Sequence, residues 1–449
     1  MSQDAGGARL PTLSVLQASA MLVGMVIGVF IFKAPSLVAW NTTGALEFLA
    51  LWAAGGLITL IGALCYAELA TSYPHSGGEY HYLTRAYGRP LGFLFAWGRM
   101  TVIQTGAIAA VAFAYGDYAS VILPLGPQGP AIHAAIAVAV LTAVHLLGTR
   151  QSAHTQTLLT ALEVLALLAV SVIGFIIARG LPSGATTVAT GNEQAGLAMV
   201  FILLAYGGWN ELSYISGEMR DVKRTIARVL ILGTLAITLL YLLVNWALLS
   251  VFGLEGLRKT GVPVSDLVGQ AFGQAGAVVT ALMVCAMALS TMNASIFTGA
   301  RTNMALGQEF SAFSGLGPRN QRTGTPTNAV LAQSAIVLAL IGFGAVTRNG
   351  FQNMVEYTAP VFWGFMLLVG VALFVFRVRE PAREMAFRVP LYPLTPALWC
   401  AAAIYMLYSS VAYTGWGALI GIAVLGLGVP VYLAGRGAGA RVARAEGSG

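Results

Sequence analysis

The chain has 449 residues, of which 57% are hydrophobic and only 9% are charged, and its mean hydropathy is +0.77. Soluble domains carry about a quarter charged residues, so this composition excludes a protein that is surrounded by water on all sides. The net charge of +7 does not indicate nucleic acid binding, because the basic residues lie between apolar runs, where anionic headgroups of the lipid bilayer are the expected partners.

Apolar runs long enough to cross a membrane recur along the whole sequence. A hydrocarbon core about 30 Å thick requires about 20 apolar residues in a helix, whereas membrane β-strands alternate over about 10 residues. The run 230–251 is apolar on every side, so the sequence predicts an all-α membrane protein with about 12 transmembrane helices. In chain order the expected helices are 13–38, 46–72, 91–121, 132–147, 156–178, 194–216, 229–252, 275–303, 328–346, 351–376, 395–412 and 416–433.

The distribution of basic residues predicts an orientation. With this helix order, most of the 24 Lys and Arg residues fall on the side of the N-terminus. Cytoplasmic loops carry an excess of these residues, so we expect both termini in the cytoplasm and the protein in the plasma or inner membrane. The segment 1–12 would be cytoplasmic, and the tail 434–449, rich in Gly, Ala and Arg, would be a flexible basic end.

Glycines interrupt the first and the sixth expected helix near mid-membrane. The first contains GMVIGVF at 24–30, and the sixth contains AYGGWN at 205–210. An interrupted helix is tolerated in lipid only where its freed peptide groups face protein or a water-filled cavity. Close helix packing through small residues is the alternative explanation. If the chain contains two inverted repeats of five helices, the two interrupted helices are equivalent, which favours a binding site at the breaks.

Four short motifs occur in order along the chain, namely GALCYAEL at 62–69, SGGEY at 76–80, AYGGWN at 205–210 and NASIFT at 293–298. Each is weak alone, but together they resemble the amino acid-polyamine-organocation (APC) superfamily, in particular its L-type amino acid transporters. The resemblance implies a LeuT-like fold with inverted repeats at 13–178 and 194–376 and two further helices at 395–433. It also implies alternating access to a small-molecule substrate, an amino acid or a related amine, held at the two breaks.

The resemblance also places the substrate contacts. Backbone N–H groups at 28–30 would bind a carboxylate, carbonyl groups of the first and sixth helices would bind an amino group, and side chains of the third and sixth helices would shape the pocket. The residues expected at the site are Ile27, Gly28, Val29, Phe30, Gln104, Leu204, Ala205, Gly207, Trp209 and Asn210.

The sequence departs from the family pattern at several positions. Members that bind a carboxylate have Gly-Ser-Gly at the first break, whereas this chain has Gly28-Val29-Phe30, which leaves less room beside the backbone. Lys33, just beyond that break, is atypical and is expected to face the outer vestibule. The cysteine that ties some eukaryotic members to a heavy chain is missing from 116–130, so no disulfide-linked heavy chain is expected.

Two carboxylates fall inside expected membrane helices, where ionisable groups are costly and usually functional. Glu163 aligns with the helix-five lysine of the family and has three interpretations: a proton carrier, a ligand for the amino group of the substrate, or a neutral acid hydrogen-bonded in the bundle. Glu356, in the tenth helix, is the weaker candidate for proton coupling. Glu211 either lines the cavity or caps the second half of the sixth helix. The charged run 218–228 is expected to be a solvated loop.

The sequence therefore favours a secondary active transporter that moves an amino acid, coupled to protons or working by exchange. The alternative is a carrier of amines without a carboxylate, such as a polyamine or an amino alcohol, which would suit the crowded first break and the acidic Glu163. A membrane-embedded enzyme is a third hypothesis, but no convergent nucleophile, acid and base are visible, and the five His residues lack metal-ligand spacing. We therefore expect no enzymatic activity, no cofactor and no metal.

Overall fold

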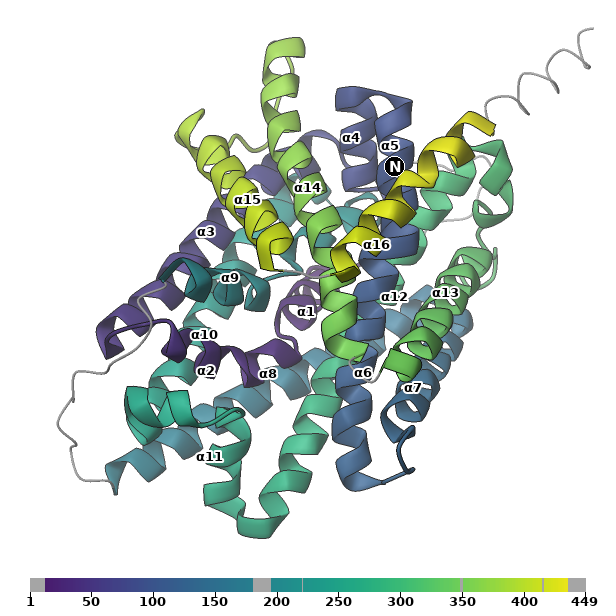
Figure 1. The fold of residues 1–449 in the computed structure, drawn as a ribbon. Coiled ribbons are helices and arrows are strands. Elements are labelled where there is room, and N and C mark those ends of the chain that lie inside the picture. Colours follow the sequence, from purple (N-terminus) through teal and green to yellow (C-terminus); the bar gives the residue numbers. More distant parts are fainter. Residues whose placement is uncertain (1–12, 181–194, 220, 348–349, 414–415, 435–449) are drawn as a thin grey trace, which may run out of the picture.

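The computed structural model describes residues 13–180, 195–219, 221–347, 350–413 and 416–434. Within these ranges the chain forms helices and no β-strand (Figure 1). Ten of the helices described are long and apolar enough to cross a membrane, and two shorter apolar helices, Val15–Val26 and Ala418–Ala434, accompany them. The prediction of an all-α, multi-pass membrane protein is confirmed.

The helices follow the expected order. The first half comprises α1 (Val15–Val26), η1 (Val29–Phe32), α2 (Ala34–Trp40), α3 (Ala45–Ser72), α4 (Glu79–Tyr87), α5 (Arg89–Gly98), η2 (Arg99–Ile103), α6 (Gln104–Ile122), α7 (Gly129–Leu147) and α8 (Thr149–Arg179). The second half comprises α9 (Ala195–Ala205), η3 (Trp209–Glu218), α10 (Val222–Lys259), α11 (Pro263–Phe272), η4 (Gly273–Ala275), α12 (Gly276–Glu309), η5 (Ser311–Leu316), α13 (Thr327–Thr347) and α14 (Gly350–Arg379). The chain then adds α15 (Leu394–Tyr413) and α16 (Trp416–Gly426).

Two short helices in connecting segments were not predicted, because neither has an apolar run of membrane-spanning length. α4 begins within the second motif, SGGEY at 76–80, shortly after α3 ends, and α11 lies between α10 and α12. The expected end of the seventh span near residue 252 is confirmed, since α10 contains a non-helical Gly253 with φ 62° and ψ 176°. Only glycine adopts such a conformation readily, so the chain changes direction there.

The two faces of the bundle are named here by their helices. The N-terminal face is the one at which α1 begins and α4 lies, at the top of Figure 1, and the opposite face is the one that carries α11, at the bottom. The Leu13 peptide N–H donates to the Glu218 carbonyl at 2.9 Å, so the start of α1 and the end of η3 meet at the N-terminal face. The orientation of these faces in a cell remains a prediction.

α8 shows how the bundle separates lipid from protein. Its side chains Leu158, Leu165 and Ile176 are 63%, 62% and 62% exposed, whereas Glu163 is 0% exposed. An apolar outer surface around a polar inner stripe is the reverse of a soluble helix and is expected where the solvent is lipid. The inner stripe repeats every three to four residues; it is polar over the first half of α8, at Ser152, Gln156, Thr160 and Glu163, and mostly apolar beyond, at Leu167, Val170 and Gly174.

The breaks in the first and sixth spans, followed by unbroken spans in each half, agree with a LeuT-like arrangement of five plus five helices with two more. The repeat limits 13–178 and 194–376 and the pair at 395–433 remain predictions. The expected cytoplasmic segment 1–12 and nearly all of the expected tail 434–449 lie outside the described residues.

Candidate functional site

The first membrane helix is broken where the sequence predicted. α1 ends at Val26, Ile27 has φ −76° and ψ 82°, and Gly28 is extended, with φ −105° and ψ −178°. The chain then resumes as the 3-10 helix η1 at Val29. Ile27 is fully buried, so the interruption lies inside the bundle, and the Gly28 N–H donates to the Val26 carbonyl at 2.8 Å.

The two glycines of the first break have different roles. A Cβ added at Gly24 would lie within 2.5 Å of side-chain atoms of Gln156, Thr160 and Ser290, so this glycine serves close helix packing. A Cβ added at Gly28 would meet only the Thr291 hydroxyl, at 3.6 Å. Packing therefore explains Gly24, whereas Gly28 leaves space beside the broken backbone.

The sixth membrane helix is broken at the equivalent depth. α9 ends at Ala205, and Gly208 adopts the left-handed conformation, with φ 105° and ψ −16°, before η3 begins. A Cβ at Gly208 would lie 2.6 Å from the carbonyl oxygen of Met25 in α1. Glycine is thus required twice, once for the dihedral angles and once for the close approach of the two breaks.

Tyr241 of α10 connects the two breaks. Its hydroxyl oxygen lies 2.9 Å from the Val26 carbonyl oxygen and 3.1 Å from the Ala205 carbonyl oxygen, and the side chain is fully buried. Carbonyl groups at a helix end lose their regular intrahelical donors. The Val26 carbonyl accepts from the Gly28 N–H at 2.8 Å, and the phenol supplies a further donor to it and a donor to the Ala205 carbonyl, which lipid cannot do. The sequence analysis missed this residue, although a lone tyrosine within the apolar run 230–251 was a usable signal.

A cavity of about 960 Å³ leads from the opposite face to the first break. Val29 and Phe30, both predicted as substrate contacts, line this cavity, as do Lys33 and Asp117. We call it the vestibule. The expectation that Lys33 faces an outer vestibule agrees with its place in this lining.

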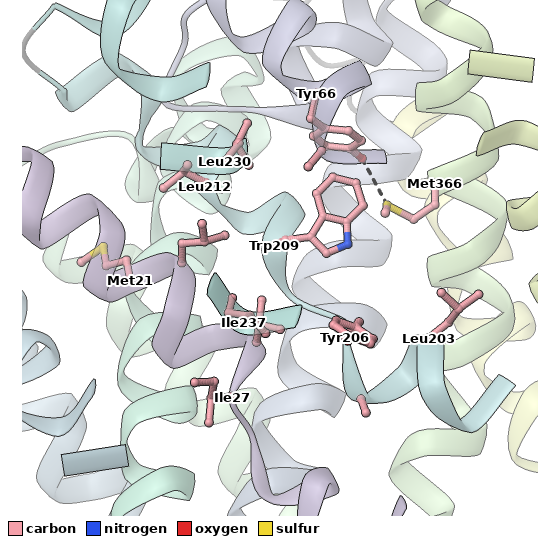
Figure 2. Close-up of a cluster of buried hydrophobic side chains, with 14 of the residues drawn as sticks. Met21, Ile27, Tyr66, Leu203, Tyr206, Trp209, Leu212, Leu230, Ile237 and Met366 are labelled. Carbon is pink, nitrogen blue, oxygen red and sulfur yellow. Dashed lines mark hydrogen bonds between the residues drawn. The ribbon is translucent and has the colours of Figure 1, made fainter. Parts of the chain in front are cut away.

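Trp209 and Asn210 lie on the other side of the second break and do not line the vestibule. Trp209 packs edge-to-face on Tyr66, with ring centroids 4.9 Å apart, and Figure 2 shows the two rings side by side. It packs in the same way on Trp399, at 5.3 Å. Asn210 donates its amide N–H to Glu79 at 2.9 Å. Both side chains therefore seal the bundle toward the N-terminal face in this conformation.

The other predicted contacts have varied surroundings. Gln104 opens α6 directly after the π-helical turn η2, and its amide donates to the Ser295 carbonyl of α12 at 2.9 Å. Leu204 and Gly207 are half-buried at the second break, where Ala205 is buried. Gln104 therefore joins α6 to α12, a contact that the sequence did not predict.

Glu163 occupies a fully enclosed position on α8. Neither of its carboxylate oxygens has a hydrogen-bond partner within the described part of the chain, although the Ser290 hydroxyl of α12 interacts with it electrostatically. Buried polar atoms without partners are rare and call for an explanation. The nearby Thr160 hydroxyl donates to the Ala20 carbonyl of α1 at 2.9 Å, so this stretch of α8 contacts the first broken helix. Glu356 lies on α14, but its side chain is outside the described residues.

On the N-terminal side of the breaks, a buried ion pair joins the third and sixth spans. Arg99 of η2 donates through both terminal nitrogens to Glu211 of η3, one bond being 2.8 Å, and the Thr298 hydroxyl donates to Glu211 at 2.6 Å. The Arg99 and Glu211 side chains are 1% and 10% exposed. Glu211 thus has a partner in a different helix, which neither interpretation of the sequence anticipated.

A second ion-pair cluster lies nearer the N-terminal face. Glu218 accepts hydrogen bonds from Arg301 of α12 at 3.0 and 3.1 Å and from Arg319 at 2.9 Å. The expectation that 218–228 is a solvated loop was wrong, because Glu218 is the last residue of η3 and 2% exposed, and 222–228 form the first turns of α10. The two cationic partners of Glu218 are far away in the sequence, so the local charge pattern could not reveal them. Together the ion pairs close the path between the breaks and the N-terminal face.

A family model described as amino acid permease matches residues 13–429 of this chain. The chain belongs to the amino acid permease family. The permease is 28% identical to the b(0,+)-type amino acid transporter 1 of Mus musculus over 85% of this chain and 79% of the relative. It is 30% identical to the large neutral amino acids transporter small subunit 2 of Mus musculus, over 97% and 83% of the two chains. It is 26% identical to the serine/threonine exchanger SteT of Bacillus subtilis (strain 168), over 94% and 95%.

The family membership confirms the resemblance to the APC superfamily and its L-type transporters. It also confirms that this protein is an amino acid transporter and not an enzyme. The helical architecture adds that the permease is an integral, multi-pass membrane protein. Its three cysteines, Cys65, Cys285 and Cys400, form no disulfide with one another.

Proposed function

We propose that the permease binds its amino acid between the two helix breaks and carries it across the membrane by alternating access. The observation that supports this most directly is the Tyr241 hydroxyl, which joins the carbonyl groups of Val26 and Ala205 at both breaks. With a vestibule on one side of the breaks and buried ion pairs on the other, the conformation is the one expected of a carrier that loads from the opposite face.

In this proposal the peptide groups at the breaks hold the substrate. The N–H groups of Val29 and Phe30 bind the carboxylate, joined by that of Gly28 when it leaves the Val26 carbonyl. The carbonyl groups of Ile27, Leu204, Ala205 and Gly207 bind the amino group. Gln104, Trp209 and Asn210 shape the wall that the side chain of the substrate meets. Half-helix ends suit a zwitterion, because one presents N–H groups to an anion and the other presents carbonyl groups to a cation.

A carrier of amines is the second candidate, because Val29 and Phe30 line the vestibule where other members have small residues. Purified permease in proteoliposomes separates the two. We expect uptake of L-leucine or L-threonine to exceed uptake of the matched decarboxylated amines, 3-methylbutylamine and 1-aminopropan-2-ol. Uptake of the amines alone would replace the amino acid proposal with the amine proposal.

We further propose that Glu163 carries the coupled proton. A carboxyl group buried without a partner can take up a proton from one side and release it to the other as its access to water changes. Replacement of Glu163 by Gln should abolish pH-driven accumulation of the amino acid while leaving exchange at equal pH. Glu384→Gln removes a carboxylate at an exposed position and serves as the matched control. Full pH-driven accumulation by Glu163→Gln would exclude Glu163 as the proton carrier.

The N-terminal face is proposed to be cytoplasmic, with the protein in the plasma or inner membrane and without a disulfide-linked heavy chain. The support is the excess of Lys and Arg on this face. A reporter that is active only in the cytoplasm, fused to the C-terminus, should be active. Activity of a reporter that works only outside the cytoplasm would reverse the orientation.

A further inference from the structure

The vestibule carries one cation and one anion among its lining side chains. Lys33 follows η1 on the first broken helix, and Asp117 lies near the end of α6. The remaining lining residues are uncharged. The same cavity is lined by both charges and by Val29 and Phe30 at the break, so a substrate inside it lies in the field of both charges.

Neither charge has an ionic partner among the residues that the structure describes: Lys33 and Asp117 form no ion pair with each other or with a third side chain. Arg258, another cation toward the opposite face, is different. It is 5% exposed, donates to the Ala39 carbonyl at 2.9 Å and pairs with Glu255. Arg258 therefore has a structural role, whereas the charges of Lys33 and Asp117 face the cavity without an ion pair in the described part of the chain.

Two opposite charges on the walls of one cavity match the charge pattern of a free amino acid. The α-ammonium and α-carboxylate groups sit on one carbon atom, so one ligand can meet a cation and an anion at once. Complementary charges steer a ligand to its site and fix its orientation. An amine without a carboxylate would be attracted by Asp117 and repelled by Lys33, so the pair would discriminate against it.

The volume of the vestibule, about 960 Å³, is at the upper end of the range for small-molecule sites, about 300–1,000 Å³. A free amino acid leaves much of this space to water. The charges therefore act as a first contact in a wet entrance and not as an enclosed pocket, and their effect should depend on the ionic strength.

We propose that Lys33 and Asp117 form a docking site for the zwitterionic amino acid in the vestibule, with Lys33 meeting the carboxylate and Asp117 the ammonium group. This inference rests on the proposed function, because it assumes that the amino acid enters through the vestibule. The docking site selects for a carboxylate before the substrate reaches the crowded break at Val29 and Phe30.

The test is initial-rate uptake of L-leucine or L-threonine, whichever the wild type transports, into proteoliposomes at low ionic strength. Lys33→Gln should raise the KM by about fivefold with little change in kcat, since loss of a charge at the rim of a site acts mainly on association. Lys33→Arg should retain most of the affinity. The matched control is Lys259→Gln, which removes an exposed cation toward the same face that does not line the vestibule.

The orientation of the ligand is tested with the methyl ester of the same amino acid as a competitor, because the ester keeps the ammonium group and lacks the carboxylate. Lys33→Gln should leave inhibition by the ester unchanged or strengthen it, whereas Asp117→Asn should weaken both inhibition by the ester and uptake of the amino acid. The exchanged pair Lys33→Asp with Asp117→Lys should transport better than Lys33→Asp alone.

The possible failures are distinguishable. If the wild type takes up no amino acid, the proposed function itself is wrong. If it does, and Lys33→Gln has the wild-type KM for the amino acid at low ionic strength, the docking site is excluded while the proposed function stands. An equal loss of affinity for the amino acid and for its ester in Lys33→Gln would also exclude a carboxylate contact.

Discussion

At the N-terminal side of the breaks, the charged side chains Arg99, Glu211 and Glu218 are buried and joined in ion pairs. At the opposite side, Lys33 and Asp117 line a cavity with no ionic partner in the described part of the chain. Burying a charge is costly unless it is paired, whereas a charge beside water keeps its solvation. The comparison shows how one bundle can use charge to close one side of a pathway and to receive a solute on the other.

The substitution with the largest expected effect on stability is at Arg99, in the buried ion pair on the N-terminal side of the breaks. Replacing Arg99 by Met leaves Glu211 buried without its cation, which should lower the free energy of unfolding by about 3–5 kcal/mol. Thermal unfolding in detergent measures the loss. The double variant Arg99→Met with Glu211→Leu should recover most of the stability, because it removes both charges. A double variant as unstable as the sum of the two single variants would contradict the role of this pair.

The next effect concerns the close approach of the two breaks. Gly208→Ala places a Cβ 2.6 Å from the Met25 carbonyl oxygen and forces a left-handed conformation on alanine. We expect a destabilisation of about 2–4 kcal/mol and loss of transport, from strain and overpacking together.

Its neighbour provides a matched control. At Gly207 the nearest atom to an added Cβ is the Leu204 carbonyl oxygen, at 3.2 Å, and no positive φ is required. Gly207→Ala should therefore cost less than Gly208→Ala. Equal stability of the two variants would mean that the breaks do not pack as tightly as the structure indicates.

A smaller effect is expected at Tyr241, whose hydroxyl joins the two breaks. Tyr241→Phe removes the donor from the carbonyl groups of Val26 and Ala205 but keeps the ring. The Val26 carbonyl keeps the Gly28 N–H as a donor, so the loss falls mainly on the buried Ala205 carbonyl, and it should cost about 1–2 kcal/mol and slow transport. Tyr408→Phe, at a side chain 70% exposed, should change neither property. Wild-type transport and stability in Tyr241→Phe would show that the two hydrogen bonds of the Tyr241 hydroxyl are dispensable.

The parts of the fold that depend on local sequence could be predicted. Long apolar runs predicted the membrane spans, and glycines in the first and sixth spans predicted both breaks. These features depend on residues that are close together in the chain. The same is true of Lys33, which lies one helical turn beyond the first break and lines the vestibule.

The parts that depend on distant partners could not be predicted. The partners of Glu211 and Glu218 lie about 80 to 110 residues away in the sequence, so a single sequence carries no sign of their pairing. Glu218 was therefore assigned to a solvated loop. The π-helical turn η2 was missed for a similar reason, because its sequence, RMTVI, carries no feature that separates it from a regular helix.

The most direct test of the central claim is the reactivity of a cysteine placed at the first break. In a variant with Cys65, Cys285 and Cys400 replaced by Ser, Val29→Cys should react with a membrane-impermeant thiol reagent added from the opposite face, and a transported amino acid should slow that reaction. A cysteine that does not react, or that reacts at the same rate with and without the amino acid, would contradict a substrate path through the broken helices.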